Sequence, residues 1–496
     1  MIYVWSRVGR IFTKVTILAM TMICLGASAT LNAAPLTLAG ALEIAYANSP
    51  DMKRAGYSLS ASQHNELAQQ AALKSQLSLT LTPYNFTRSR TFYSFRGQYS
   101  IEEQTTSTAR FAIDQPIVWT DGTLSLSESV TYRDSKSSDN LSTDGTLYFN
   151  NLLLSFSQPI FTYNKVKMES ERVRRDLQRS SLNFALQKLM IERDVTSQFL
   201  NLYRFQRSLQ IAQERLNNAT ESLEIIQSKV DAGISAMEEF YQADLSQASS
   251  RASHENSRSQ YENSMDNFKI LLGMELDEEV EVLPDIQKEQ IEVDLATAIN
   301  HGLSYRMELR QRKMDIQDAM DNLTQAGSQD EFAGTVELSY GLSSDANNFE
   351  DLFKSNSKDH TIAVRLNVPL FDWGEKKHRM AASRTQVQRQ ELNEEDQRNR
   401  IVLEIREAYR TLQNQKTQIE IAEKNVRNAQ LTYDINLDRY RNGDLSSKDI
   451  SFYQEQLSTE QLNEVQALID YQLSLLELKI RTLYDFKNGR SVLPIN

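Results

Sequence analysis

A tandem repeat of more than 200 residues is the feature of this sequence that most restricts its possible folds. When the sequence is shifted by 210 residues, three similar features align. A proline-containing segment, Gln158–Phe161, aligns with Val368–Phe371, and a periodic apolar run, Leu209–Ala219, aligns with Ile419–Ala429. Gly233 aligns with Gly443. Upstream, Leu38–Pro50 resembles Leu295–Met307 at a larger offset of 257 residues. Two copies of this length are too few and too long for a solenoid, so we predict a pseudo-twofold architecture.

Each copy is predicted to run in the same order, which is a helix, strands, a very long helix, a glycine break and a further helix. The offset changes between the landmarks, so most of the length difference lies in the strand-like part. We therefore divide the chain into a signal peptide at 1–29, a first repeat at 36–286, a second repeat at 293–486 and a C-terminal tail at 487–496. The strands are expected at about 77–163 and at about 333–371.

The long helices are predicted from apolar residues that step alternately by three and four, which is the pattern of a coiled-coil seam. In the first copy these residues are Leu209, Ala212, Leu216, Ala219, Leu223, Ile226 and Val230. In the second copy they are Ile419, Ala422, Val426, Ala429, Tyr433 and Tyr440, interrupted by Asn436. A helix from Lys165 to Gly233 holds roughly 70 residues and measures about 100 Å at 1.5 Å per residue. Gly233 and Gly443 then end the two long helices, and the seams are interpreted as packing.

The N-terminus has the features of a secretory signal peptide. Its basic residues are Arg7, Arg10 and Lys14. They precede an apolar run at Val15–Leu25, which is too short to span a membrane comfortably, and a small-residue cleavage site at Ala27–Ala29. The only cysteine, Cys24, lies in the apolar run, so a mature chain would have no disulfide. Removing three basic residues takes the net charge from −12 to −15, which disfavours binding to nucleic acid.

The strand regions are typical of a transmembrane β-barrel. Between Tyr84 and Tyr163 there are 14 aromatic residues, about twice the density of the whole chain, in which aromatics make up 8%. Alternating apolar and polar residues occur at Leu77–Thr82, Gly122–Ser127, Thr335–Leu342 and Thr361–Val368. A soluble β-sandwich is the alternative interpretation of this alternation. A helical membrane protein is excluded, because no later segment offers about twenty consecutive apolar residues.

The number of strands adds a further constraint. About four to six candidates are long enough to cross a membrane, whereas a single-chain barrel needs at least eight. If these strands span a membrane, several chains must share one barrel, because an open sheet edge cannot lie in lipid. Pro159 and Pro369 suit the ends of strands, where the chain leaves the sheet for a long helix.

The first copy is predicted to carry one more hairpin than the second. Phe111–Gly122 resembles Leu154–Asn164, with Gln115–Ile117 matching Gln158–Ile160. The polar segment Tyr132–Gly145 between them is typical of a connector between hairpin strands. The sequence leaves open whether this hairpin enlarges the barrel or folds outside it.

In this order and in duplicate, these features resemble the TolC-like outer-membrane efflux proteins. The resemblance covers about 36–486 and includes the similar openings at Leu38 and Leu295 and the glycine-break segments Asp231–Phe240 and Tyr440–Ile450. It implies an α+β membrane protein built from a tandem-duplicated unit, in which a long coiled-coil α-helical barrel is continuous with a transmembrane β-barrel shared between protomers of a homotrimer. The implied location is the outer membrane, extending into the periplasm. The implied partners are outer-membrane lipid, a periplasmic adaptor (membrane fusion) protein and an inner-membrane transporter.

The resemblance also implies where the periplasmic entrance lies. The acidic residue six positions after the glycine is Glu239 in the first copy and Asp449 in the second, and the tyrosine three positions before the second glycine is Tyr440. The residues that correspond to the adaptor contact are Gly233, Ile234, Ser235, Gly443, Asp444 and Leu445. The alternative interpretation of Glu239 and Asp449 is a solvated helix face near an N-terminus, where acidic residues are favoured.

Two positions depart from the family pattern, which has an arginine where this chain has Leu445 and a second aspartate where it has Phe452. The complete closure network of tyrosine, arginine and aspartate is therefore not predicted, and Lys448 is the candidate replacement for the arginine. We expect closure to depend more on apolar packing here.

Taken together, the sequence predicts a passive outer-membrane exit duct of a tripartite efflux or type I secretion system, exporting small molecules or proteins. The alternative is a soluble periplasmic coiled-coil structural or adaptor protein. An enzyme is not predicted, because the five histidines have no paired ligand spacing and there is no phosphate loop or nucleophile elbow. No cofactor and no metal are expected.

Overall fold

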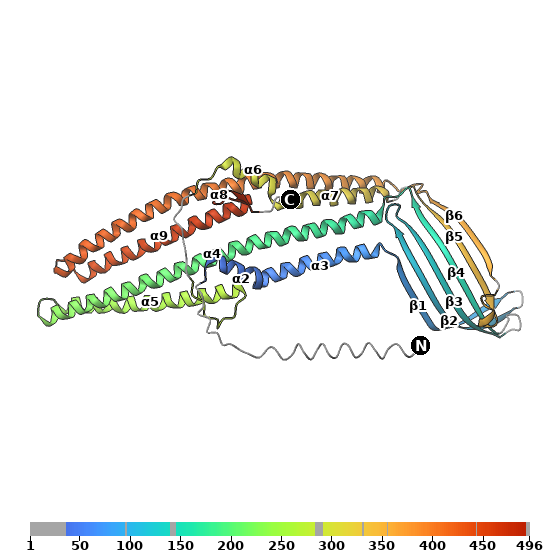
Figure 1. Ribbon diagram of the computed structural model, residues 1–496, viewed down its shortest axis with the longest axis horizontal. Helices are drawn as coiled ribbons and strands as arrows, with labels where there is room; N and C mark the ends of the chain where they lie inside the picture. Colours follow the sequence, from blue (N-terminus) through green and yellow to red (C-terminus); the bar gives the residue numbers. More distant parts are fainter. Residues whose placement is uncertain are drawn as a thin grey trace, which may run out of the picture.

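The protein is elongated, with a β-sheet at one end and the tips of two helical hairpins at the other (Figure 1). The computed structural model describes residues 36–94, 97–138, 145–282, 291–329, 332–354, 356–442 and 444–492. The predicted signal peptide and the last four residues of the predicted tail lie outside the described residues. Among the described residues, no helix has both the length and the apolar character needed to cross a membrane.

The first helices of the two repeats correspond closely. Helices α2 (Leu38–Asn48) and α6 (Leu295–Tyr305) each have 11 residues and begin at a side-chain cap, from Thr37 and from Asp294. Each is followed by one residue in an extended conformation, Ser49 (φ −52°, ψ 132°) or Arg306 (φ −58°, ψ 129°). The chain then continues into helices α3 (Pro50–Ala72) and α7 (Met307–Ser328).

The long helices are present in both repeats, as the alternating apolar pattern predicts. Helix α4 (Lys165–Asp231) has 67 residues and α8 (Glu375–Asn442) has 68. Each is followed by a partner of 36 residues, α5 (Met237–Leu272) or α9 (Ser447–Thr482). The two hairpins run side by side away from the sheet (Figure 1).

The seam residues face the neighbouring helices. Ala212, Ala219 and Ile226 are buried, and the leucines between them are half-buried. Asn436, the interruption in the second seam, is also buried, and its side-chain amide donates to the carbonyl oxygen of Thr432 at 2.8 Å. The polar residue is therefore satisfied within its own helix and does not break the seam.

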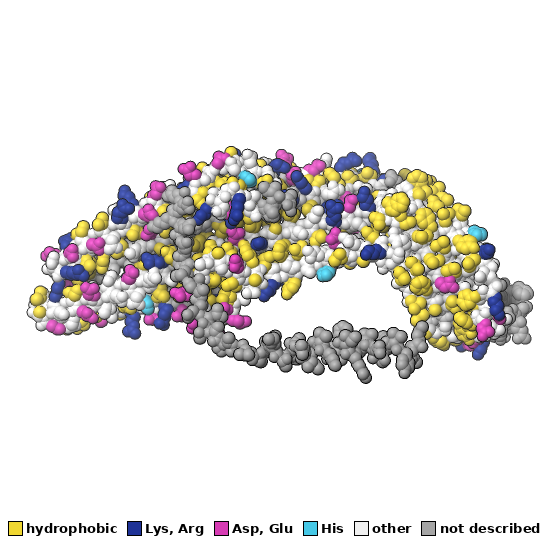
Figure 2. Space-filling view, viewed as in Figure 1, with side chains coloured by type: hydrophobic (Ala, Val, Ile, Leu, Met, Phe, Trp, Pro, Cys, Tyr) yellow, Lys and Arg dark blue, Asp and Glu magenta, His cyan; other side chains and the backbone are white. Residues whose placement is uncertain are grey.

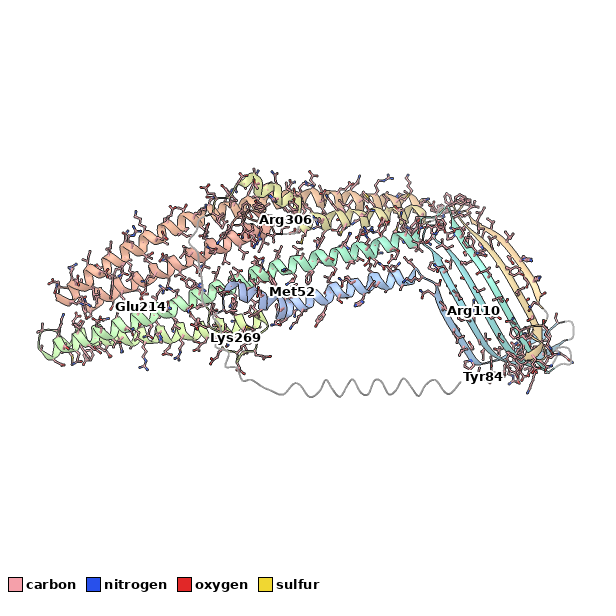
Figure 3. All side chains as sticks on the ribbon, viewed as in Figure 1. Met52, Tyr84, Arg110, Glu214, Lys269 and Arg306 are labelled. Carbon is pink, nitrogen blue, oxygen red and sulfur yellow. The ribbon has the colours of Figure 1, made fainter. Side chains whose placement is uncertain are left out.

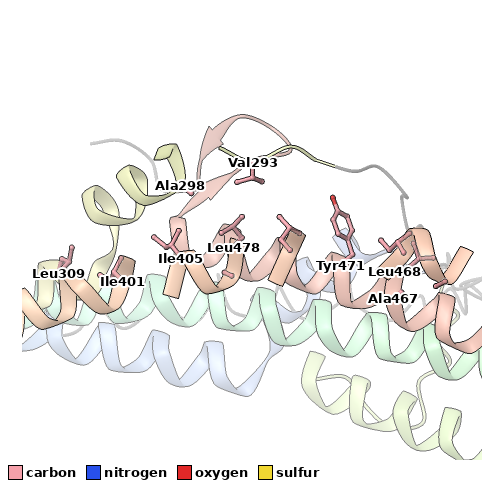
Figure 4. Packing of buried hydrophobic residues seen from close by; sticks show 13 residues of the cluster. Val293, Ala298, Leu309, Ile401, Ile405, Ala467, Leu468, Tyr471 and Leu478 are labelled. Atoms are coloured by element: carbon pink, nitrogen blue, oxygen red, sulfur yellow. The ribbon is translucent and has the colours of Figure 1, made fainter. Parts of the chain in front are cut away.

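The largest apolar cluster lies where α6 packs on the α8–α9 hairpin (Figure 4). Its centre contains Ile401, Ile405 and Leu412 of α8 and Leu478 of α9, none of which is exposed. A similar cluster joins α2 to α4 and α5 around Phe199 and Phe268. Each short helix thus closes the open side of its own hairpin.

The six longer strands form one antiparallel sheet in the order β1-β2-β3-β4-β5-β6. Their bounds are β1 Gln76–Tyr93, β2 Gln98–Ile117, β3 Gly122–Ser137, β4 Gly145–Ile160, β5 Ala333–Ala346 and β6 Ser357–Asn367. The extra hairpin predicted for the first copy is confirmed, because four strands lie between α3 and α4 and only two lie between α7 and α8. The remaining short elements are η1 (Phe349–Asp351), β7 (Tyr484–Asp485) and β8 (Arg490–Ser491).

The two faces of the sheet differ in chemistry. Strand register places Leu79 opposite Phe111, and Leu154 between Leu126 and Tyr340, all on one face. On β1, Leu77, Leu79 and Leu81 are each at least 60% exposed, as are Ile362 and Val364 on β6. The other face is rich in Ser and Thr, such as Thr108 and Thr131, whose hydroxyl oxygens are 3.1 Å apart. Figure 2 shows the apolar side chains gathered over the sheet.

A half-buried group of charges fixes the bend between α6 and α7. The Arg306 guanidinium (Figure 3) donates to the carboxylates of Glu308 on α7 and Glu404 on α8. Arg481 of α9 also contacts Glu404, with 2.8 Å between Nη1 and Oε2. Burial alone would raise the pKa of Glu308, but the hydrogen bonds and charge of Arg306 outweigh it and hold that pKa below its usual range.

We predict that Arg306→Leu destabilises the α6–α7 bend by about 2–3 kcal/mol, less than the ~3–5 kcal/mol of a fully buried pair, because it leaves partly exposed carboxylates without their cation. Because the folded-state pKa of Glu308 lies below the unfolded value, the wild-type contribution is present above about pH 4.3 and is lost as pH falls through the lower folded value. Thermal unfolding in detergent, followed by circular dichroism at pH 7 and pH 3, measures both effects. Arg310→Leu, at an exposed position of α7, is the matched control, and an equal loss in both variants would contradict the prediction.

Candidate functional site

The tips of the two helical hairpins form the end of the molecule opposite the sheet (Figure 1). They are joined by an apolar cluster that we call the tip cluster, consisting of Ile226, Ala243, Ala429, Tyr433, Tyr440, Ile450 and Leu457. These residues come from all four helices of the two hairpins (α4, α5, α8 and α9), so their packing fixes the two reversals relative to each other.

The first reversal is a left-handed turn centred on Gly233. Its φ of +72° is one that residues with a Cβ rarely adopt, and a Cβ built there would meet no atom within 4 Å. The amide of Gly233 donates to Val230 O at 2.9 Å, and the amide of Ile234 donates to Lys229 O at 2.8 Å. These two bonds form a Schellman motif, so glycine is required by backbone conformation and not by space. The Ile234 side chain is left 77% exposed at the tip.

The second reversal is similar where it is described. Gly443 lies outside the described residues, but the amide of Asp444 donates to Arg439 O at 2.9 Å, which corresponds to the bond made by Ile234. Asp444 is exposed, whereas Leu445 is half-buried against the tip cluster. The apolar residue at this position therefore does pack inward.

Glu239 connects the two hairpins. It lies in the first turn of α5, and its Oε2 accepts a hydrogen bond from the backbone amide of Ser447, the first residue of α9, at 3.0 Å. A carboxylate at that position satisfies an unpaired helix amide and interacts favourably with the helix dipole. Ser447 itself is buried. Sequence reasoning placed Glu239 near its own helix N-terminus but did not identify Ser447 as its partner.

Tyr440 is enclosed between the hairpins, with 1% of its surface exposed. Its hydroxyl donates to Ser222 O of α4 at 3.4 Å, and Lys229 Nζ donates to the Tyr440 carbonyl oxygen at 3.3 Å. Burial raises the pKa of Tyr440 above its ordinary value, and the Glu239 carboxylate adds to the rise. Sequence reasoning missed Lys229, although a cation near the C-terminus of α4 is a common feature of helix ends.

Asp449 is exposed in the first turn of α9 and takes part in the cap of that helix. The hydroxyl of Ser446 donates to Asp449 Oδ2 at 2.7 Å and accepts from the Asp449 amide at 3.3 Å. The Ser446 hydroxyl thus caps the amide of the third residue of α9, and the Asp449 carboxylate holds that hydroxyl in place. No hydrogen bond or ion pair within the described part of the chain joins Asp449 to Glu239.

Phe452, which stands where the family pattern has an aspartate, is 64% exposed and packs against the ring of Tyr453 at 5.5 Å between centroids. Lys448 is exposed. Among the residues that the structure describes, no three His, Cys, Asp or Glu side chains lie together in a way that could hold a metal ion. The arrangement offers charged and apolar contact surfaces at a tip.

We predict that Glu239→Ala loosens the start of α9, because the Ser447 amide loses its acceptor, a loss worth about 1 kcal/mol, or roughly a fivefold change in an opening equilibrium. Hydrogen–deuterium exchange of residues 447–450 should rise by that factor. The neighbouring, exposed Glu238→Ala is the control, and equal exchange in the two variants would show that the bond does not stabilise this turn.

The sequence profile of a family described as outer membrane efflux protein matches residues 122–274 and 298–480, which together are more than half of the chain. No curated protein matches the chain.

The chain is also similar in structure to solved outer-membrane channels. The CmeC channel of Campylobacter jejuni superposes with a TM-score of 0.68 at 14% identity, covering 92% of this chain and 87% of that one. For VceC of Vibrio cholerae the TM-score is 0.65 at 17% identity, with coverages of 90% and 95%. For the open state of the MtrE channel of Neisseria gonorrhoeae it is 0.64 at 14% identity, with coverages of 92% and 91%. At these identities the likeness shows a shared fold.

Proposed function

The chain belongs to the outer membrane efflux protein family, and we propose that three copies of it form a passive exit duct that crosses the outer membrane and continues through the periplasm. The observation that carries the proposal is one open six-stranded sheet, apolar on one face, whose strands lead directly into helices of 67 and 68 residues. At 1.5 Å per residue each long helix measures about 100 Å.

The sheet explains why copies would have to assemble. Strands β1 and β6 are its two edges, and each has paired with only one neighbour. In lipid, unpaired backbone amides and carbonyls are so unfavourable that spanning sheets close into barrels. Six strands are fewer than the eight of a minimal barrel, so closure requires further copies. The exposed leucines of β1 and the aliphatic side chains of β6 would then face lipid, and the Ser- and Thr-rich face would line the lumen.

The helical part supports the role of a tunnel. Charged side chains are exposed along the length of its hairpins (Figure 2), and the seams bury only narrow apolar stripes. Three copies arranged around one axis would place the two tips of each chain at the periplasmic end. No residue of the described helices suggests that the duct itself performs chemistry, and the motive force would come from an inner-membrane transporter.

We propose that the tips contact a periplasmic adaptor protein. The exposed Ile234 and the residues around it, Gly233 and Ser235, would present one contact, and Asp444 with Leu445 and Gly443 would present the other. Glu239, Asp449 and Tyr440 would form the entrance, with closure supported by the tip cluster. Because Glu239 holds the start of α9, movement of one hairpin tip would be transmitted to the other.

We propose small molecules or proteins as the cargo, since efflux and type I secretion both suit this architecture. The competing function is a soluble periplasmic coiled-coil structural or adaptor protein. The broad apolar face of the sheet favours the duct, since monomeric soluble proteins rarely expose contiguous apolar surface of this kind.

We predict that the full-length protein partitions into the outer-membrane fraction, requires detergent for extraction and then runs as a trimer in native mass spectrometry. The physical reason is that the exposed aliphatic side chains of β1 and β6 need lipid or detergent. Cell fractionation followed by immunoblotting measures this. Recovery of the chain as a monomer in the periplasmic fraction without detergent would favour the soluble alternative.

We predict that neutralising the acidic entrance with Glu239→Gln and Asp449→Asn together lowers cation preference and weakens block by divalent cations. In water a unit charge about 4 Å from a divalent cation contributes about 2 kcal/mol, so losing even one such contact should weaken block by Mg²⁺ by about thirtyfold. Single-channel recording in planar bilayers measures the effect, and Glu238→Gln is the matched control. Unchanged selectivity and block in the double variant would remove the acidic ring from the mechanism.

A further inference from the structure

The two repeats contribute unequal numbers of strands to the same sheet. The first provides β1 to β4 and the second provides β5 and β6, and all six are hydrogen-bonded in chain order. The extra hairpin therefore does not fold beside the sheet, and β4 pairs with β5 along 13 residue pairs. A chain whose repeats matched would have four strands in place of six.

The ends of β2 and β4 are equivalent in detail. The side-chain amide of Gln115 donates to Pro116 O at 2.7 Å and to Leu73 O, in the turn before β1, at 3.1 Å. The side-chain amide of Gln158 donates to Pro159 O at 2.7 Å and to Thr120 O, in the turn before β3, at 2.6 Å. Each glutamine thus ties the end of its strand to the start of the strand that precedes it.

The turn between β2 and β3 also resembles the strand-to-helix junctions. Asp121 has a φ of 63°, close to 62° for Phe161 before α4 and 53° for Trp373 before α8. This turn is fastened to the start of α4, because Asp121 Oδ1 accepts from the Val166 amide at 2.9 Å and Asn164 donates to Val118 O at 2.6 Å. The β2–β3 turn therefore lies at the junction between sheet and helices.

The two hairpins also keep the same alternation of faces. Counting back from Ile117 and from Ile160, Ile113 corresponds to Phe156 and Phe111 to Leu154. Register through β3 places all four on the apolar face. Replacing β4 by β2 beside β5 would therefore leave apolar residues on the same side, which is the condition for a hairpin to be inserted without inverting a sheet.

We infer that β3–β4 is a second copy of the β1–β2 hairpin inserted into the barrel wall, and that the barrel consequently holds eighteen strands and passes bulky polar solutes. This rests on the trimer of the proposed function, since six strands in each of three chains make eighteen. Four strands in each chain would make twelve, and because barrel diameter grows roughly linearly with strand number, the insertion widens the barrel about 1.5-fold. Barrels of about 16–18 strands leave an aqueous channel. The narrow part of the duct is then at the hairpin tips.

The lumen chemistry agrees with polar cargo. The face opposite the apolar one carries Arg110, Asp114 bonded to Ser125, and Glu337 paired with Arg365. These groups would hold water in a wide pore, and the same face also carries the apolar residues Leu147, Phe149 and Leu153.

Cryo-electron microscopy of the full-length protein in nanodiscs tests the inference directly. Eighteen strands in a trimer are expected. A trimeric barrel of twelve strands, with one hairpin of each chain outside the wall, would overturn the inference and leave the proposed duct intact. A protein that does not enter membranes would instead overturn the proposed function.

The repeated Gln-Pro-Ile tripeptide permits a seamless variant. Deleting residues 118–160 joins Ile117 to Phe161, so that the same three residues still precede the junction with α4. The deletion variant should form a trimer with twelve strands. If the deletion variant fails to assemble, the strand count of the full-length protein still decides between a barrel of eighteen strands and one of twelve.

A cysteine on the polar face of the sheet can be used to compare the width of the barrel lumen in the two proteins. Ala112→Cys on β2 is present in both proteins, and the only native cysteine, Cys24, lies in the predicted signal peptide. Maleimide–polyethylene glycol reagents of increasing size, added outside intact cells, should label the full-length protein up to a larger size than the deletion variant. The same size limit in both would overturn the widening.

Discussion

The structure depends on one constraint, which is that a backbone amide or carbonyl in lipid must have a hydrogen-bond partner. The six-stranded sheet pairs its strands with one another, whereas the outer edges of β1 and β6 have no neighbouring strand. Those edges are also where exposed aliphatic side chains concentrate. A single chain is therefore incomplete as a membrane structure, and assembly with further copies follows from the backbone before any side-chain contact is considered.

The helices follow a different rule, because they stand in water and need only narrow apolar seams. Small residues such as Ala212, Ala219 and Ala422 let the helices approach closely, while most charged side chains stay in contact with water. Each turn of such a long helix adds little stability, because it buries little apolar surface. Contacts that hold the helices in place relative to one another are therefore important. The Arg306 group at the α6–α7 bend, the tip cluster and the Glu239–Ser447 bond supply three such points along the molecule.

Much of this fold could be predicted from the sequence, because periodic patterns of apolar residues and repeated motifs indicate its helices and strands. The seams from Leu209 and Ile419 predicted both long helices, and Gln115–Ile117 matching Gln158–Ile160 predicted the extra hairpin. The contacts that periodicity does not encode were missed. Whether the hairpin joins the sheet depends on pairing between β4 and β5, which are separated by more than 170 residues. The burial of Tyr440 and the partner of Glu239 depend on how two hairpins lie together, and no local pattern specifies that.

Hydrogen exchange along the sheet edges tests the central claim most directly. The outward-facing amides of β1 and β6 have no partner in a single chain, but each would be paired with a neighbouring copy in a closed barrel. In the assembled protein in nanodiscs, the account predicts that residues 76–93 and 357–367 exchange as slowly as the interior strand β3. Fast exchange at both edges, with β3 protected, would show that the barrel is not closed by other copies and would contradict the account.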